Sequence, residues 1–247
     1  MRIGGKPTPS LDWREQTGRV ANTLLLGRTT VPMSRFKTME EEMAGKKILM
    51  LTGEFTEEYE IFVFQQGMEA VGHQVHVICP DKKAGDKIQT SLHDFEGHQT
   101  YIERFGHLAD INKTFSEVKP EEYDAVYCAG GRGPEYIRTD KRIQAIVKHF
   151  HDAQKPIFTI CHGVQILVAV EGVVRGKKVA ALGACEPEVK LAGGTYIDVK
   201  PTEAYVDGTM VSAKGWTGLA AFMRECLKVL GTEIRHGAIL AEEKAAA

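Results

Sequence analysis

The sequence predicts an α/β protein with a mainly parallel central sheet, because short apolar segments alternate along the chain with segments of helical apolar spacing. Four short apolar runs predict buried strands at 47–52, 74–79, 124–129 and 157–160. Three segments with apolar residues at helical spacing predict helices at 60–72, 143–150 and 163–171. Strands separated by helices are typical of a parallel sheet with both faces covered, which predicts a three-layer sandwich.

The C-terminal part of the chain adds a strand, a hairpin and a helix to this pattern. A strand is expected at 178–182, and Asp207-Gly208 lies between the β-forming residues of 204–212, which predicts a hairpin turn. Apolar residues at helical spacing predict a closing helix from about Gly218 to Leu230. We therefore expect one domain over residues 45–235, since single domains reach roughly 200–250 residues.

The two ends of the chain lack the strand and helix pattern. Residues 1–44 have no sustained hydrophobic period. We expect an arm, with a short helix around Leu11–Leu26, that docks on a neighbouring subunit or is partly disordered. Residues 236–247 are expected to form a C-terminal tail.

The composition argues against several classes of partner. A formal net charge of −2 gives no basic field for nucleic acid, and no apolar stretch approaches the roughly 18 residues of a membrane helix. Five scattered cysteines without a C-x-x-C pair indicate reduced thiols rather than a disulfide scaffold. We therefore predict a cytoplasmic protein that binds neither nucleic acid nor a membrane.

The most informative segment is residues 155–165, where a predicted strand passes directly into a predicted helix at Cys161. A residue at such a joint is held in a tight turn with its side chain above the sheet edge, as in a nucleophile elbow. Gly163 supplies one small flanking residue, and the helix N-terminus favours a thiolate and offers amides to an oxyanion. A cysteine that merely packs in the core is the alternative, but the neighbouring His162 favours a functional thiol.

Other loops after predicted strands carry candidate functional residues. Residues 53–60 contain four glutamates, and spacing alone does not identify which one turns inward. Gly131 lies in a glycine-rich turn, where its N–H is available as an oxyanion donor. Two histidines in 93–101, among them His98, are a weak metal signal, and we prefer a structured loop near the pocket. Trp216 either lines the pocket or caps the core.

Four segments in the order found here resemble the ThiJ/PfpI superfamily over roughly residues 46–231. They are 53–60 (GEFTEEYE), 93–101 (HDFEGHQTY), 129–136 (AGGRGPEY) and 159–167 (TICHGVQIL). The resemblance implies a flavodoxin-like fold related to class I glutamine amidotransferases. The second segment is most similar to the plant-type, glutathione-independent glyoxalase III branch. The resemblance also implies a homo-oligomer, as a dimer or hexamer, and neither a metal nor an organic cofactor.

By this resemblance Cys161 is the nucleophile, His162 is the neighbouring acid/base, and Glu57 is the carboxyl group that contacts the thiol. The loop before the last helix departs from the glyoxalase III pattern. That branch carries Trp-Pro-Gly-His-Pro, whereas 216–220 reads WTGLA, nearer to the PfpI protease-like branch. The residues expected to bind substrate or an oxyanion are Gly131, Gly163, His98 and Trp216.

The leading functional hypothesis is conversion of small 2-oxoaldehydes, such as methylglyoxal, to 2-hydroxy acids through a Cys161 hemithioacetal. Three alternatives use the same thiol: peptide hydrolysis, deglycation, and redox sensing through oxidation of an exposed thiol of low pKa. Glutamine amidotransfer is disfavoured, because its triad needs a distal His-x-Glu. The only histidine after His162 is His236, which Gly237-Ala238 follows.

Overall fold

The computed structural model describes residues 45–234. The predicted arm at 1–44, with its helix around Leu11–Leu26, and the predicted tail at 236–247 lie outside the described residues. Within the described range the strands form a six-stranded, a three-stranded and a two-stranded sheet. None of the helices in this range is long and apolar enough to span a membrane.

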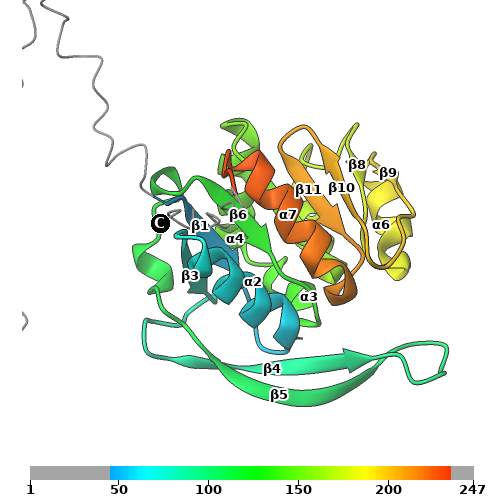
Figure 1. Ribbon diagram of the computed structural model, residues 1–247, viewed down its shortest axis with the longest axis horizontal. Coiled ribbons are helices and arrows are strands. Elements are labelled where there is room, and N and C mark those ends of the chain that lie inside the picture. The colour runs from blue at the N-terminus through cyan, green and yellow to red at the C-terminus, as the bar shows by residue number, and fades with distance from the viewer. Residues whose placement is uncertain (1–44, 235–247) are drawn as a thin grey trace, which may run out of the picture. The chain divides into compact units, whose positions relative to one another are not determined.

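The six-stranded sheet has the strand order β10-β11-β7-β6-β1-β3 (Figure 1). Its strands are β1 (Lys47–Leu51), β3 (Gln74–Ile78), β6 (Ala125–Cys128), β7 (Ile157–Ile160), β10 (Ala204–Asp207) and β11 (Met210–Ala213). Neighbouring strands are parallel except β10 and β11, an antiparallel hairpin whose turn contains Gly208 at a φ of 63°. The predicted α/β class with a mainly parallel central sheet is confirmed, and all four predicted buried strands lie in this sheet.

Helices cover both faces of the central sheet, with α2 and α7 on one face and α4 and α5 on the other (Figure 1). The α-helices are α2 (Glu58–Ala70), α3 (Gly133–Ile137), α4 (Lys141–Asp152), α5 (Val164–Val168), α6 (Glu186–Leu191) and α7 (Leu219–Val229). Short 3-10 segments lie at Phe115–Glu117, Pro120–Glu122, Cys161–Gly163, Gly183–Cys185 and Trp216–Gly218.

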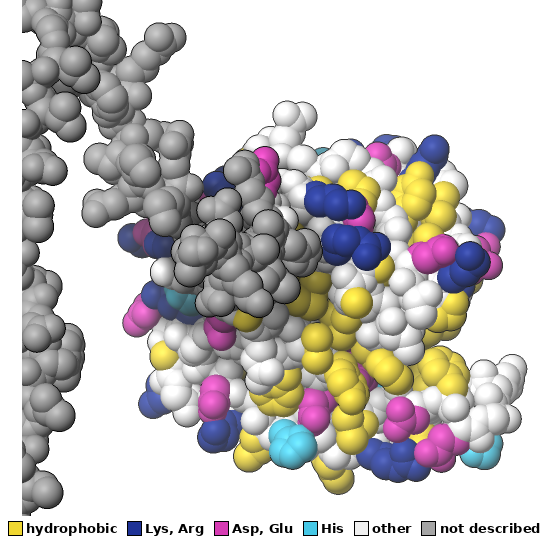
Figure 2. All heavy atoms as spheres, viewed as in Figure 1, with side chains coloured by type: hydrophobic (Ala, Val, Ile, Leu, Met, Phe, Trp, Pro, Cys, Tyr) yellow, Lys and Arg dark blue, Asp and Glu magenta, His cyan; other side chains and the backbone are white. Residues whose placement is uncertain are grey.

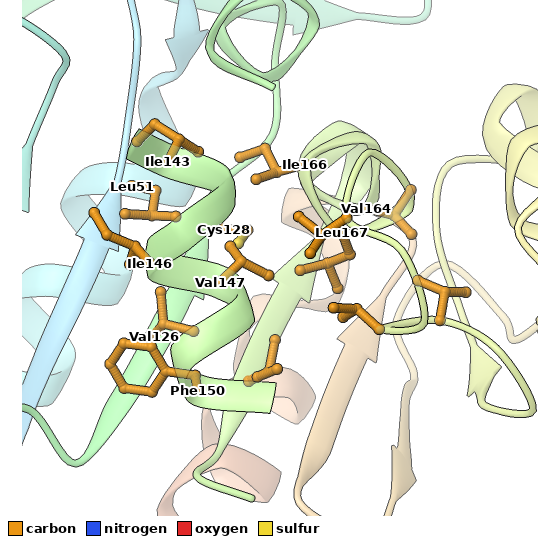
Figure 3. Packing of buried hydrophobic residues seen from close by; sticks show 14 of the residues in the cluster. Leu51, Val126, Cys128, Ile143, Ile146, Val147, Phe150, Val164, Ile166 and Leu167 are labelled. Carbon is orange, nitrogen blue, oxygen red and sulfur yellow. The ribbon is translucent and has the colours of Figure 1, made fainter. Parts of the chain in front are cut away.

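The alternation of side chains along β1 divides the core into two layers, since successive residues of a strand point to opposite faces. Leu49 and Leu51 belong to the cluster that packs against α4 and α5 (Figure 3). Ile48 belongs to the other cluster, which contains Phe64 of α2 and Phe222 of α7. The strand is therefore buried on both faces, as its continuous apolar sequence predicts.

The sequence does not predict the long hairpin of β4 (Lys87–Asp94) and β5 (Ile102–Asp110), which runs along one side of the domain (Figure 1). Together with β2 (Thr56–Glu57) these strands form the three-stranded sheet. Only one residue of β5 is buried, so the strand has no apolar period. The segment 93–101, expected as a loop, forms the end of this hairpin.

Two further elements differ from the sequence prediction. The strand expected at 178–182 is limited to β8 (Lys178–Val179), which pairs with β9 (Thr195–Tyr196) in the two-stranded sheet. The helix after Cys161 ends at Val168 rather than at 171. Turns and bends follow at residues 169–172, and Gly172 has a φ of 85°, outside the right-handed helical region.

Candidate active site

Cys161 occupies the turn between β7 and α5. Its φ of 55° lies in the left-handed region, which a non-glycine residue enters at a cost of about 1–3 kcal/mol. Gly163 is buried against β6, where a Cβ would lie 2.1 Å from the carbonyl oxygen of Cys128. Gly163 therefore permits the helix to pack on the sheet and does not line the pocket expected for it. The Cys161 side chain lies half-buried at the carboxyl edge of β7.

Three kinds of group surround the sulfur of Cys161. The imidazole Nδ1 of His162 lies 3.5 Å from Sγ, although the two residues are adjacent in sequence. The backbone N–H groups of Gly131 and His162 donate to the sulfur, an arrangement that also suits an oxyanion. The carboxyl group of Glu60 lies next to the thiol, and its interaction with Cys161 lowers the pKa of Glu60 against the larger effect of burial.

The carboxyl group at the thiol belongs to Glu60, which corrects the expectation that Glu57 would hold this position. Glu60 is fully buried in the first turn of α2, and its Oε2 accepts the N–H of Gly130 at 2.6 Å. Its Oε1 is buried without a hydrogen bond of ordinary geometry, so the thiol is the group with which it can share a proton. Glu57 lies in β2, where its Oε2 instead accepts the backbone N–H of His93 at 3.0 Å.

The charges at the thiol are coupled. Burial and the nearby charge of Glu57 raise the pKa of Glu60 well above its usual range, which favours the protonated carboxyl group. Burial and the charge of Glu60 also raise the pKa of Cys161, and they outweigh the amide N–H groups, which lower it. The resting sulfur is therefore a thiol, in place of the thiolate expected from the helix N-terminus.

His162 is the group that can accept the thiol proton. Burial and the positive charge of His93 lower the pKa of His162 to about 4, so its imidazole is neutral at physiological pH. The ring of Tyr101 packs against this imidazole edge-on, with ring centroids 5.6 Å apart. A neutral imidazole beside the sulfur can take the proton while the sulfur attacks a carbonyl carbon.

A chain of charged groups runs from the pocket wall towards the surface. His93 Nδ1 lies 2.6 Å from Glu57 Oε2, and His93 Nε2 lies 3.0 Å from Glu103 Oε2. Arg132 donates to the second oxygen of Glu103 at 2.7 Å. Burial lowers the pKa of His93, but its hydrogen bonds with the two carboxyl groups outweigh burial and raise it. Both ring nitrogens of His93 are therefore occupied, and neither is directed at a substrate.

The thiol opens onto a pocket of about 310 Å³. The lining residues are Glu57, His93, Phe95, Tyr101, Cys161, His162, Leu182, Gly183, Pro201, Lys214, Gly215, Trp216 and Thr217. Trp216 lies at this pocket, as one of the two sequence interpretations expects. His98 does not: it is exposed in the connection between β4 and β5. The histidine of this segment that reaches the pocket is His93, which the sequence analysis does not single out.

The remaining cysteines are buried and free, and burial raises the pKa of each. They are Cys79, Cys128, Cys185 and Cys226. This agrees with a packing role and leaves Cys161 as the half-buried thiol of the described range. Within residues 45–234 no group of three or more His, Cys, Asp or Glu side chains is placed to hold a metal ion.

The fold and the site define an α/β protein with a cysteine on a strand-to-helix turn and a buried glutamate beside its sulfur. The chain belongs to the DJ-1/PfpI family, whose pattern it matches over residues 46–229. This range contains the whole central sheet, the hairpin and every group that surrounds the thiol.

Relatives in plants and bacteria are similar over most of the described range. Protein DJ-1 homolog D of Arabidopsis thaliana is 41% identical over 192 residues, which cover 77% of this chain and 49% of that protein. Protein/nucleic acid deglycase 2 of Escherichia coli K12 is 33% identical over 190 residues, 76% of this chain and 99% of that protein. The chain spans about half the length of the Arabidopsis relatives it matches.

Solved structures share the fold. A ThiJ/PfpI domain protein of Brachyspira murdochii aligns with a TM-score of 0.63 at 26% identity, over 75% of this chain and 95% of that chain. DJ-1beta of Drosophila melanogaster aligns with a TM-score of 0.60 at 18% identity, over 76% of this chain and 92% of that chain. The second likeness shows the fold alone.

Proposed function

We propose that this protein is a cysteine-dependent enzyme of the D-lactate dehydratase class, which converts small 2-oxoaldehydes to 2-hydroxy acids without a cofactor. The observation that carries the proposal is the contact of Cys161 with two proton-carrying groups, Glu60 and His162, at one pocket. The conversion moves a proton between adjacent carbon atoms, so it needs a nucleophile and groups that hold protons beside it.

The first step is addition of the thiol to the aldehyde. Sγ of Cys161 bonds to the aldehyde carbon while His162 accepts the thiol proton. The aldehyde oxygen carries negative charge at this stage, and the amides of Gly131 and His162 lie beside the point of attack. Return of the proton from His162 to that oxygen gives the neutral hemithioacetal.

The second step moves a proton between the two carbons. His162 removes the proton from the carbon bonded to sulfur, giving an enediolate, and the protonated Glu60 supplies a proton to the neighbouring carbon. The hydroxyl proton on the sulfur-bearing carbon moves to the oxygen of the neighbouring carbon. The product is a thioester of the 2-hydroxy acid, and His162 passes its proton back to Glu60 through the site. Water cleaves the thioester and releases the acid and the thiol. One carbon is oxidised as the other is reduced, so no external oxidant is needed.

Lactate formation from methylglyoxal tests the proposal directly. We expect wild type to produce lactate, Cys161→Ala to produce none above the uncatalysed rate, and Cys79→Ala to retain activity. Cys79 is a matched control, because it is a free, buried cysteine that directly follows β3, the edge strand of the same sheet, away from Cys161. Lactate production by Cys161→Ala at the wild-type rate would refute the proposal.

Deglycation is the second candidate, because several relatives carry the name deglycase, including one from Thermococcus kodakarensis that is 38% identical over 144 residues. The same thiol would attack a carbonyl adduct of an amine or thiol. The two activities are separated with preformed methylglyoxal adducts of N-acetylcysteine. A deglycase consumes the adduct faster than free aldehyde is released from it, whereas an enzyme for free aldehyde is limited by that release.

Peptide hydrolysis and redox sensing receive less support from the site. Among residues 45–234 no carboxyl group is hydrogen-bonded to the imidazole of His162, so a third member of a protease triad is not found in this range. Redox sensing requires an exposed thiol of low pKa. Cys161 is half-buried, and burial raises its pKa.

The homo-oligomer implied by the resemblance stays a prediction. Strand β5 is the edge of its sheet and exposes two large apolar side chains, Phe105 at 76% and Leu108 at 54%. Hydrophobic side chains also gather over α2 and between α2 and the hairpin on the face shown in Figure 2. If two copies of the chain contact each other through β5, Phe105→Glu should lower the molecular mass of the assembly in solution, which light scattering measures.

A further inference from the structure

We infer that the pocket beside Cys161 is built for a carbonyl substrate with a flat, uncharged apolar substituent, and that Trp216 selects for this substituent. The inference deepens the proposed function by naming the substrate class of the same site. It rests on that function for the reaction, but the shape and polarity of the pocket support it independently.

The size of the pocket is the first argument. A volume of about 310 Å³ lies at the lower end of the range found for pockets that hold drug-sized ligands, about 300–1,000 Å³. Methylglyoxal has only five non-hydrogen atoms and would leave most of this space filled with water. Pockets of this size hold ligands with a ring or a chain of several carbons.

The polarity of the wall is the second argument. Beyond the groups that surround the thiol, the wall is formed by the aromatic rings of Phe95, Tyr101 and Trp216 together with Leu182 and Pro201. The charged side chains of the wall already have partners. Glu57 is bound to His93, and Lys214 is paired with Asp198 outside the pocket.

These pairings leave no wall charge for a phosphate or carboxylate on the substrate. An ionic substituent would have to compete with Asp198 for Lys214 in a partly exposed ion pair, where ion pairing contributes little. An apolar substituent would instead gain the free energy of leaving water against the rings. The wall therefore favours an uncharged apolar group.

The position of Trp216 is the third argument. Its indole N–H donates to the carbonyl oxygen of His93 at 3.2 Å, and its ring stacks on Tyr59 with centroids 5.3 Å apart and planes 18° apart. The ring is thus fixed from two sides and offers a rigid flat surface. The backbone N–H of Trp216 also faces Glu60, the group at the thiol, and lowers its pKa. A ring stacked on Trp216 would therefore lie next to the carbon that the sulfur attacks.

Turnover of two aldehydes by the full chain tests the inference. We expect kcat/KM for phenylglyoxal to exceed that for methylglyoxal by about tenfold or more, the size of effect that burying an aromatic ring gives. Trp216→Ala should lower the ratio of the two kcat/KM values about tenfold, and Trp216→Phe should retain most of the preference for phenylglyoxal. Tyr136→Ala is the control, because Tyr136 is an aromatic residue 70% exposed outside the pocket. A wild-type ratio of one or less, unchanged in Trp216→Ala, would overturn the inference.

A binding measurement separates this inference from the proposed function. Acetophenone and acetone carry a phenyl and a methyl group on the same unreactive ketone. Saturation-transfer NMR should detect acetophenone on wild type and on Cys161→Ala, with the signal weakened in Trp216→Ala, and should detect no acetone. If acetophenone binds in this way but neither aldehyde is turned over, the pocket assignment stands and the proposed reaction fails. Equal acetophenone signals from wild type and Trp216→Ala would contradict the role of Trp216.

Discussion

Glu60 Oε2 accepts the backbone N–H of Gly130 at 2.6 Å, and this contact joins the first turn of α2 to the loop after β6 directly beneath the thiol. The contact fixes the buried carboxyl group beside Cys161, while its other oxygen, Oε1, is buried without a hydrogen-bond partner. Two chain segments far apart in the sequence thereby position one proton. Activity should consequently depend on Glu60 more than on any other glutamate of the 53–60 segment.

Glu60→Gln should lower kcat/KM for methylglyoxal by about 10²–10⁴-fold, the range that a proton-transfer group contributes. Glutamine keeps the size of the side chain and can still accept the N–H of Gly130, but it cannot exchange a proton with the thiol. Steady-state kinetics of lactate formation measures the loss, with circular dichroism to establish that the variant is folded.

Glu57→Gln is the matched control for this substitution. Glu57 is equally buried and three residues away, but its carboxyl group is bound to His93 rather than to the thiol. We expect a much smaller loss than in Glu60→Gln. Equal losses in the two variants would show that proximity to the sulfur is not what matters.

The pH dependence of thiol alkylation follows from the same coupling. Once Glu60 is ionised, its charge is a cause of the raised pKa of Cys161, second to burial. Removal of that charge in Glu60→Gln should therefore lower the pKa of the thiol. Iodoacetamide alkylation of Cys161, followed by intact mass against pH, should rise at a lower pH in Glu60→Gln than in wild type. A shift to higher pH would mean that the carboxyl group stabilises the thiolate instead.

Much of the fold could be predicted because its central strands are short, apolar and buried on both faces. The helix faces were equally clear: Ile143, Ile146, Val147 and Phe150 all turn inward from α4. The β4–β5 hairpin could not be found in this way. β5 packs few of its side chains against the core, so its sequence IERFGHLAD carries no period of two.

Some residues of the candidate site could be predicted from the sequence and others could not. Cys161 was identifiable because strand and helix meet there without a loop. Glu60 was identifiable in principle, because it precedes Phe64 and Met68 by four and eight residues on the buried face of α2. His93 was not, because its place beside Glu57 depends on a hairpin that the sequence does not reveal.

The free energy of unfolding should decrease in acid because His162 is harder to protonate in the folded protein than in the unfolded chain. Its pKa is lowered from 6.5 to about 4 in the folded protein, first by burial and then by His93. The unfolded chain therefore binds a proton between these pH values that the folded chain does not, so stability is fully present above about pH 6.5 and decreases as the pH falls. In urea denaturation, the free energy of unfolding of wild type should fall by about 3 kcal/mol relative to that of His162→Gln between pH 7 and pH 4.

His93 is a control, because its contribution to stability should change with pH in the opposite direction to that of His162. Its pKa is raised in the folded state, because the hydrogen bonds to Glu57 and Glu103 outweigh burial. Its contribution to stability is therefore fully present below pH 6.5 and is lost as the pH rises through the folded pKa. The stability difference between wild type and His93→Gln should shrink with rising pH. A difference that grew with pH would contradict the charged state assigned to this pair.

Gly130→Ala should disrupt the site by crowding rather than by changing charge. A Cβ at this position would lie 2.5 Å from Cys161 Cβ, 2.6 Å from Glu60 Oε2 and 2.9 Å from the amide nitrogen of His162. The backbone and a fixed carboxyl group must therefore move, which costs about 1–3 kcal/mol and displaces the groups around the sulfur. Gly67→Ala is the control, since its Cβ would meet only the flexible end of Met223. The free energy of unfolding from urea denaturation and kcat/KM should both fall in Gly130→Ala, and both should stay near wild type in Gly67→Ala. Full activity in Gly130→Ala would show that the glutamate, amide and thiol need not be held this closely.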